Sequence, residues 1–316
     1  MHLIKPSFEI WEQLPGEVGI YKQIERCGRV CYKSESNTTE DSYKRFVEML
    51  KSHAHGAMLE HGTVYLKLLH KDLINQYSDD SFFTDGVEVL YNLERRYEKH
   101  PYAKVNHVAG DGLYITTNYR VLVENDWLED LQYLCESTKY HERRVTVHFS
   151  TDIGVSREFN RHRVNSMAEQ STRYCNYSKN KFGGELSVCL PPEFTEEEVS
   201  RSMLGDAMVD YCGIPLQGLC RMIAEDQTDE FTEIDYWMFA NLACEWSYMN
   251  LIRLGWTPQQ ARRVLPLDLN TELVHTAFVS DWEHFFELRC AKDAHPDARA
   301  LAIPLREEFV KRGYIQ

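Results

Sequence analysis

The densest group of side chains able to bind an anion lies between Arg157 and Arg173, in the string REFNRHRVNSMAEQSTR. These seventeen positions hold four arginines and a histidine, in a chain whose formal net charge is −14. Guanidinium groups donate paired hydrogen bonds in a fixed geometry that matches phosphate and carboxylate groups. The segment therefore predicts an anion-binding site. A solvated charged face, paired with nearby acids, is the alternative that the charges alone leave open.

The elements that position this segment follow from the hydrophobic pattern. A strand is predicted at 145–149, and two hydroxyl residues at 150–151 are placed to cap a helix that runs to about Arg163. On that helix, Arg157 and Arg161 share one face because they are four residues apart. The pattern thus predicts that the arginines project together from one helix and its end.

The N-terminal half contains strand-like patterns. A strand is predicted at 63–69, and a hairpin is predicted from 105–108 to 113–116 with Asp111-Gly112 at its turn. Because alternating apolar residues bury one face of such strands, these segments should form a sheet with a covered side.

The C-terminal part is predicted to be mostly helical. Apolar residues recur at helical spacing over 196–223 and 231–254. Two further helices are expected after the caps Thr257 and Ser280. No internal repeat or low-complexity linker divides the sequence. The simplest architecture is therefore one α+β domain over 1–316, with strands and helices mixed and a helical C-terminal part.

The composition is that of an ordinary globular protein. Hydrophobic residues make up 43% of the chain and charged residues 27%. No apolar run approaches the roughly 18 residues needed to cross a bilayer, and the first residues lack the features of a secretory signal. The sequence therefore predicts a cytoplasmic protein with no membrane partner. Its negative charge argues against a nucleic-acid partner, since such binders carry a basic face.

The cysteines and histidines do not predict a metal site. Nine cysteines are scattered with no C-x-x-C pair, and the nearest two are Cys27 and Cys31, so buried free thiols are expected. His53, His55 and His61 suggest a metal as an alternative, but no H-E-x-x-H motif accompanies them. A Rossmann or Walker nucleotide site is not indicated either, because the chain lacks both glycine-rich motifs.

The anion-binding segment resembles the signature of the flavin-dependent thymidylate synthases, R-H-R-x-x-S-x-N-E-x-S-x-R. One position departs, since Ala168 stands where that family usually has asparagine. The matching residues are Arg161, His162, Arg163, Ser166, Glu169, Ser171 and Arg173.

Four flanking segments resemble the same family in the expected order. The resemblance covers roughly two thirds of the chain and is interrupted by a hairpin-containing stretch, so an insertion is expected at about 70–144. The flanking segments are Arg29-Val30-Cys31-Tyr32, His53 to His61, Ala261 to Leu267 and Phe285 to Arg289.

The resemblance implies a reaction and its ligands. Members of that family convert dUMP to dTMP with methylenetetrahydrofolate as one-carbon donor and NADPH as reductant, while FAD mediates the hydride transfer. They are homotetramers with active sites between subunits, and their fold is a single mixed α/β domain. A flavoprotein of this kind is therefore expected.

The resemblance also implies roles for individual residues. Arg289 would be catalytic and stabilise the uracil ring as its nitrogen loses a proton. The residues expected at FAD are His55, Arg161, His162, Arg163, Glu169 and His284. The residues expected at dUMP are Glu158, Arg161, Glu169, Gln170, Ser171, Thr172, Arg173, Arg262 from a second subunit, and Arg289.

Three departures from the family pattern fall in these sets. Glu158 replaces a glutamine that contacts dUMP in relatives, His284 replaces an asparagine at the flavin, and Ala168 lacks an amide. They motivate one alternative, a paralogue that binds flavin or a nucleotide but lacks synthase activity.

Other interpretations of single residues stay open. Arg262 and Arg289, taken one at a time, also fit arginines that snorkel or form salt bridges on amphipathic helices. The serine at 171 fits a local cap. From a different class of function, the arginines fit a single-stranded RNA-binding module in which Tyr174 and Tyr177 stack on bases.

Overall fold

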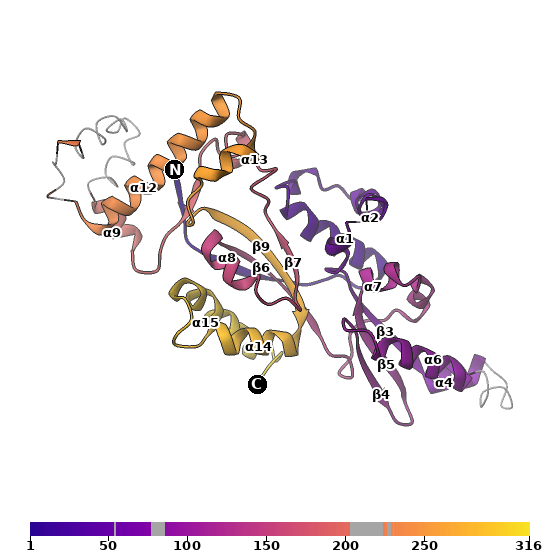
Figure 1. The fold of residues 1–316 in the computed structure, drawn as a ribbon. Coiled ribbons are helices and arrows are strands. Elements are labelled where there is room, and N and C mark those ends of the chain that lie inside the picture. Colours follow the sequence, from indigo (N-terminus) through magenta and orange to yellow (C-terminus); the bar gives the residue numbers. More distant parts are fainter. Residues whose placement is uncertain (54, 77–85, 203–223, 226–228, 230) are drawn as a thin grey trace.

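A four-stranded antiparallel sheet of order β2-β6-β9-β7 lies at the centre of the computed structural model (Figure 1). β6 pairs with β9 along its whole length, from Arg144 opposite Phe278 to Asp152 opposite Asn270. The strands are β2 (Ser7–Trp11), β6 (Arg144–Asp152), β9 (Asn270–Phe278) and β7 (Ser166–Glu169). The structure describes residues 1–53, 55–76, 86–202, 224–225, 229 and 231–316.

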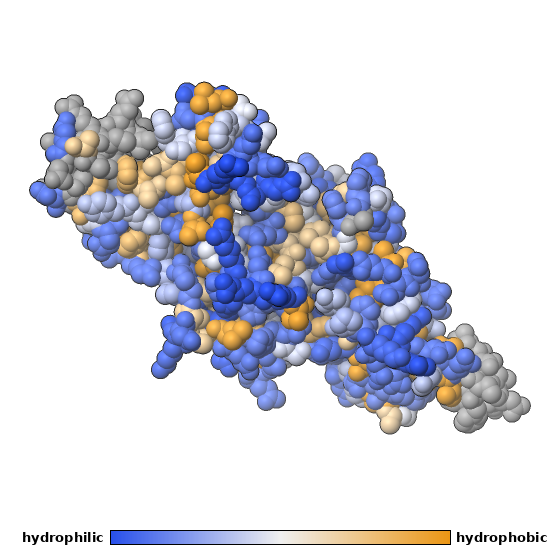
Figure 2. All heavy atoms as spheres, viewed as in Figure 1, coloured by the Kyte–Doolittle hydropathy of each residue, from blue (hydrophilic) through white to orange (hydrophobic). Residues whose placement is uncertain are grey.

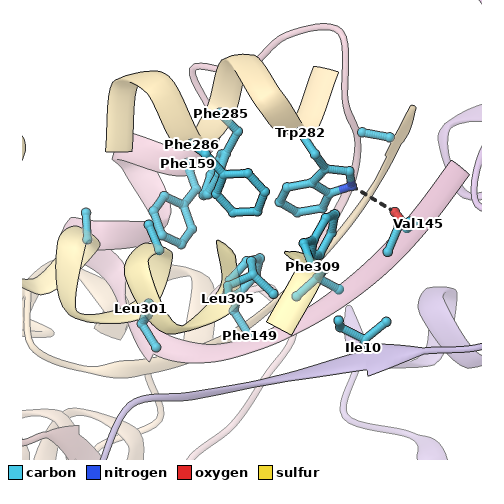
Figure 3. Close-up of a cluster of buried hydrophobic side chains, with 14 of the residues drawn as sticks. Ile10, Val145, Phe149, Phe159, Trp282, Phe285, Phe286, Leu301, Leu305 and Phe309 are labelled. Carbon is cyan, nitrogen blue, oxygen red and sulfur yellow. Dashed lines mark hydrogen bonds between the residues drawn. The ribbon is translucent and has the colours of Figure 1, made fainter. Parts of the chain in front are cut away.

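One face of this sheet is covered by three helices that bury an aromatic cluster (Figure 3). Alternate residues of β6, among them Val147 and Phe149, point to this face because side chains alternate along a strand. Trp282 packs there, and its Nε1 donates a hydrogen bond to the carbonyl of Val145 at 3.1 Å. The helices are α8 (Ile153–Phe159), α14 (Val279–Arg289) and α15 (Pro296–Lys311).

The opposite face is covered by α1 (Gly16–Val30), which packs a smaller apolar cluster around Trp11 and Val274. This face is also polar. The hydroxyls of Thr146 and Thr276 lie 2.8 Å apart between β6 and β9. The two faces of one sheet therefore differ in chemistry, with aromatic packing on one side and hydrogen bonding on the other.

A second antiparallel sheet has the order β3-β5-β4 and shares a core with α1 and with five short or medium helices near it. It confirms the predicted strand at 63–69 and the predicted hairpin. The strands are β3 (Thr63–Leu69), β5 (Gly112–Asn118) and β4 (Lys104–Val108). The helices are α2 (Ser42–Ser52), α3 (Gly56–Leu59), α4 (His70–Gln76), α6 (Val87–Glu98) and α7 (Tyr119–Glu124).

The turn of the hairpin differs from the prediction by about one residue. Gly112 already pairs with Val108 as the first residue of β5, so the turn lies at 109–111. Gly110 adopts a φ of +76°, a left-handed conformation that glycine reaches without steric cost. Gly110 therefore sets the turn where Asp111-Gly112 was expected to do so.

Helices dominate the C-terminal part, as predicted. α12 (Glu233–Arg253) fills the predicted 231–254 span, and Thr232 begins it with a capping box. The predicted 196–223 helix does not run unbroken, because α9 (Glu196–Arg201) ends at Arg201 and Ser202 is extended; residues 203–223 lie outside the described residues. α14 begins one residue earlier than the predicted cap Ser280, whose hydroxyl bonds to a glutamate outside the helix instead.

Short elements complete the fold. β1 and β8 pair in parallel beside the main sheet. Among the helices that the structure describes, none combines the length and apolarity that a bilayer-spanning segment requires. The mixture of helices and strands confirms the predicted fold class. The short elements are β1 (His2–Ile4), β8 (Ser187–Cys189), α9 (Glu196–Arg201), α13 (Pro258–Ala261), η1 (Glu35–Asn37), η3 (Leu128–Tyr133), η4 (Asn180–Phe182) and η5 (Arg262–Val264).

Candidate active site

The anion-binding segment starts in α8 and continues through a turn into β7. Asp152 begins α8, since its Oδ1 accepts a hydrogen bond at 2.7 Å from a backbone amide of the first turn. The helix ends at Phe159, so the prediction of a helix to about Arg163 is wrong. The chain must reverse there to place β7 beside β9. Arg161 therefore lies outside the helix and does not share a helical face with Arg157.

Arg289, the last residue of α14, joins the C-terminal part of the chain to this turn. Its Nε donates to His162 Nε2 at 3.0 Å. Its two terminal nitrogens donate to the carboxylate of Glu158 at 2.7 Å and to the backbone carbonyl of Glu158 at 2.6 Å. The side chain of Arg289 is only 11% exposed. Residues 131 positions apart in the sequence thus form one half-buried cluster.

The contact with Arg289 decides the protonation of His162. An arginine Nε only donates, so His162 Nε2 must accept and the ring proton must sit on Nδ1. Burial, together with the positive charge of Arg289, lowers the pKa of His162 to about 4. The ring also packs against Phe285, with centroids 4.8 Å apart. His162 is therefore a neutral hydrogen-bond donor at physiological pH.

Glu158 lies between two arginines. Its carboxylate is 2.7 Å from Arg289 and 3.9 Å from the 74% exposed side chain of Arg161. Glu158 therefore balances the charge of Arg289. An unopposed negative charge is not created at the site.

Glu169, at the end of β7, is held by α8. Its two carboxylate oxygens accept hydrogen bonds from Ser156 Oγ at 2.8 Å and from Asn160 Nδ2 at 2.9 Å. Neither Ser156 nor Asn160 was predicted as a site residue. They are four residues apart, in the last turn of α8 and at its C-cap, and this spacing, which places both side chains on one face, is the signal that would have found them.

The loop after β7 uses its backbone donors within the chain. The amide of Gln170 donates to the carbonyl of Glu272 at 2.8 Å, and the amide of Ser171 donates to the carbonyl of Cys31 at 2.9 Å. The amide of Thr172 has no acceptor among the described residues. Side chains, rather than backbone amides, are therefore the main donors that this loop offers to a ligand.

Arg173 links this loop to α13. Its Nε donates to Gln259 Oε1 at 3.2 Å, and its amide donates to the Ser171 hydroxyl at 3.3 Å. Ser171 therefore acts as a local cap, as one interpretation of the sequence allowed. Arg262 follows α13 directly and is exposed. The contact with Gln259 brings the segment that carries Arg262 close to the loop.

The sequence profile of the thymidylate synthase complementing protein family matches residues 135–312, more than half of the chain. This chain belongs to that family. The match includes the whole cluster of Glu158, His162 and Arg289 and the loop after β7. No curated protein sequence matches the chain significantly.

Solved structures similar to this family member include two of PolB, a UMP/dUMP methylase from Streptomyces cacaoi. One is bound with 5-Br dUMP, and it has 14% sequence identity and a TM-score of 0.40 over 98% of this chain and 93% of that chain. The other is bound with 5-Br UMP, and it has 14% identity and a TM-score of 0.39 over 98% of this chain and 92% of that chain.

The serine of the family signature is held by a buried arginine that sequence analysis missed. Arg144, at the start of β6, donates to Ser166 Oγ at 3.0 Å, to the carbonyl of Glu60 at 3.0 Å and to Thr63 Oγ1 at 3.3 Å. Burial lowers the pKa of Arg144 to about 10, so it stays charged. Arg144 thus ties the signature to the second sheet of this family member.

Several guanidinium groups around the cluster are exposed and have no acidic partner in the described part of the chain. In a chain of net charge −14, cations left unpaired beside one another fit an anionic ligand. Strongly hydrophilic side chains gather in a band that runs from α13 past β7 toward α14 (Figure 2). The unpaired residues are Arg163, Arg173, Arg262 and Arg263.

Of two further residues expected at FAD, His284 lies beside the cluster, whereas no contact among the described residues joins His55 to it. His284 is exposed, with its ring centroid 6.1 Å from that of His162. His55 is exposed, and its ring lies 6.1 Å from that of His53 rather than against the cluster. In the described ranges, no three His, Cys, Asp or Glu side chains are grouped to hold a metal ion.

Proposed function

We propose that this chain is a flavin-dependent thymidylate synthase that converts dUMP to dTMP. Methylenetetrahydrofolate is its one-carbon donor, NADPH is its reductant, and it works in the cytoplasm as a homotetramer. The observation that carries the proposal is the contact of Arg289 with His162 and Glu158. It joins two motif segments, far apart in the sequence, at one site in a member of the family.

FAD, when bound, supplies the hydride transfer between NADPH and the one-carbon unit. The residues of this chain fit such a dianionic, aromatic group. Arg161 and Arg163 are exposed cations for its phosphates, and His162 offers an Nδ1–H donor from a buried ring. Glu169 stays oriented by α8. The remaining proposed FAD residues are His55 and His284.

The phosphate of dUMP is assigned to side chains of the loop after β7. Since the amides of Gln170 and Ser171 bond within the chain, the available groups are the guanidinium of Arg173, the Thr172 amide and the loop hydroxyls. Arg262 is exposed and unpaired in the described part of the chain, which suits a role toward the nucleotide of a neighbouring subunit.

Arg289 is proposed to stabilise negative charge on the uracil ring. A guanidinium keeps its proton at any physiological pH, so it can bind a ring nitrogen that has lost one. Each terminal nitrogen of Arg289 carries a second N–H beyond the one bound to Glu158. His162 and Glu158 orient these donors and limit their movement, which lowers the cost of ordering them when substrate binds.

One experiment tests the whole assignment. The purified protein is supplied with FAD, its visible absorption is recorded, and NADPH is added without oxygen, followed by dUMP and methylenetetrahydrofolate. We expect flavin absorption that bleaches with NADPH and returns as dTMP forms. A protein that takes up FAD and dUMP but forms no dTMP would be the inactive paralogue. A protein that takes up neither would refute the proposal.

A further inference from the structure

The loop after β7 contacts a turn at 31–34 that follows α1, through a backbone hydrogen bond and a pair of tyrosine rings. The amide of Ser171 donates to the carbonyl of Cys31 at 2.9 Å. The rings of Tyr32 and Tyr174 lie 5.3 Å apart. The position of the loop, and of the side chains it presents, therefore depends on the position of this turn.

The turn at 31–34 contains a residue in a costly conformation. Lys33 has a φ of +47°, in the left-handed region where a side chain is disfavoured. Such a conformation persists only where surrounding contacts impose it. Part of the restraint is an ion pair between Lys33 and Glu272, a residue that also bonds to His148 Nε2 at 3.2 Å.

Lys181, which follows the loop after β7 in the chain, restrains the 31–34 turn a second time. Its Nζ, carried by η4, donates to the carbonyl of Tyr32 at 2.7 Å and to the carbonyl of Lys33 at 3.0 Å. No carboxylate lies within ion-pair distance of Lys181 among the described residues. These carbonyls follow the C-terminal end of α1, where the helix dipole favours a cation.

We propose that Lys181 is a positioning residue that holds the 31–34 turn, and through it the 170–173 loop, in the conformation that binds a nucleotide phosphate. The part of this inference that concerns the nucleotide rests on the proposed function. The holding of the turn and the loop by Lys181, which we call the clamp, rests only on the contacts of Lys181, Lys33 and Ser171. Lys181 acts through the turn and not on the reacting atoms.

The test compares Lys181→Gln with Lys179→Gln in the full chain loaded with FAD. Lys179 lies in the same loop, is exposed and has no side-chain partner in the described part of the chain. Amide hydrogen exchange over 170–175 should be about tenfold faster in Lys181→Gln and unchanged in the control. The dissociation constant for dUMP should rise about tenfold with kcat within about twofold, since the group lost touches no reacting atom.

Lys181→Arg is the variant expected to restore the contacts of Lys181. Lys181→Arg keeps a cation with several donors, so its exchange rate and dUMP affinity should stay within about threefold of the wild type. Unchanged exchange in Lys181→Gln would overturn the clamp. Faster exchange with unchanged dUMP affinity would overturn its role in phosphate binding. A wild type that binds no dUMP would refute the proposed function, while the exchange rates would still decide whether Lys181 holds the loop.

Discussion

Arg289 is held by three hydrogen bonds that leave its guanidinium plane in one orientation. Two of the acceptors belong to Glu158 and one to His162, so the side chain is fixed from the helix end and from the turn. A lysine ammonium has no rigid fork and cannot reach these three acceptors in one plane. The shape of the cation matters here as well as its charge.

Arg289→Lys should therefore lower kcat about 100-fold while leaving the folded structure intact, because one preorganised donor group at the reacting ring is lost. Steady-state dTMP formation measures the change. Arg306→Lys, at an exposed position of α15, is the matched control and should keep wild-type activity. A kcat within threefold of the wild type would show that Arg289 does not contact the reacting ring.

Glu158→Gln tests the carboxylate for which the family resemblance implies a glutamine. The carboxylate balances Arg289, so its removal should leave more positive charge for a dianionic ligand and lower the dissociation constant for dUMP about threefold. Titration calorimetry measures this constant. Glu283→Gln, exposed on the same helix as Arg289, should leave it unchanged. Weaker binding in Glu158→Gln would mean that the carboxylate itself holds the ligand.

At the scale of elements, α8 and its C-cap residue Asn160 carry most of the polar residues that organise the site. Ser156 and Asn160 orient Glu169, and Glu158 orients Arg289. The helix spans Ile153–Phe159, which is too short to be stable without its cap and its packing. The position of the site therefore depends on how α8 begins.

Asp152→Ala should remove the N-terminal cap of α8 and lower the free energy of unfolding by about 1–2 kcal/mol. Urea unfolding measures the loss. Asp152→Asn keeps an oxygen that accepts the same amide bond, so it should lose only a few tenths of a kcal/mol. Equal losses in the two variants would show that the charge, rather than the cap, stabilises the helix.

At the scale of the whole molecule, each face of the central sheet buries a histidine, His61 beside Thr276 on the side of the second sheet and His275 against Phe149 and Trp282 in the aromatic cluster. His61 and His275 are 0% exposed, and His61 Nδ1 lies 2.9 Å from Thr276 Oγ1. Burial lowers the pKa of each to about 3, and the neighbouring charge of Arg144 contributes for His61. Both rings are therefore neutral in the folded protein.

This burial predicts a loss of stability in acid. A histidine whose pKa is lower in the folded protein than in the unfolded chain stabilises the fold above the unfolded pKa, near 6.5, and this contribution is lost as the pH falls toward 3. As the pH falls from 7 to 5, each such histidine should lower the free energy of unfolding by about 2 kcal/mol. Urea unfolding should show that the free energy of unfolding of His275→Gln falls between pH 7 and pH 5 by that much less than the free energy of unfolding of the wild type. His2→Gln, at an exposed position, should keep the wild-type loss. Identical acid losses in wild type and His275→Gln would contradict the prediction.

Patterns local in the sequence determined much of this protein. Hydrophobic periodicity located β3, β6, the hairpin and α12, because local burial patterns depend on neighbours along the chain. The order of residues from Arg161 to Arg173 indicated the family that the profile match shows. The length of each apolar segment and the spacing of its residues were enough to predict these elements and the family.

Only the tertiary structure decided how the motif residues meet. The end of α8 at Phe159 is set by the pairing of β7 with β9, and no local signal marks it. The pairing of Glu158 with Arg289, the tautomer of His162 and the anchoring of Ser166 by Arg144 are long-range hydrogen bonds. Spacing in a sequence constrains which side chains share an element, whereas contacts between elements arise only when the sheets and helices pack.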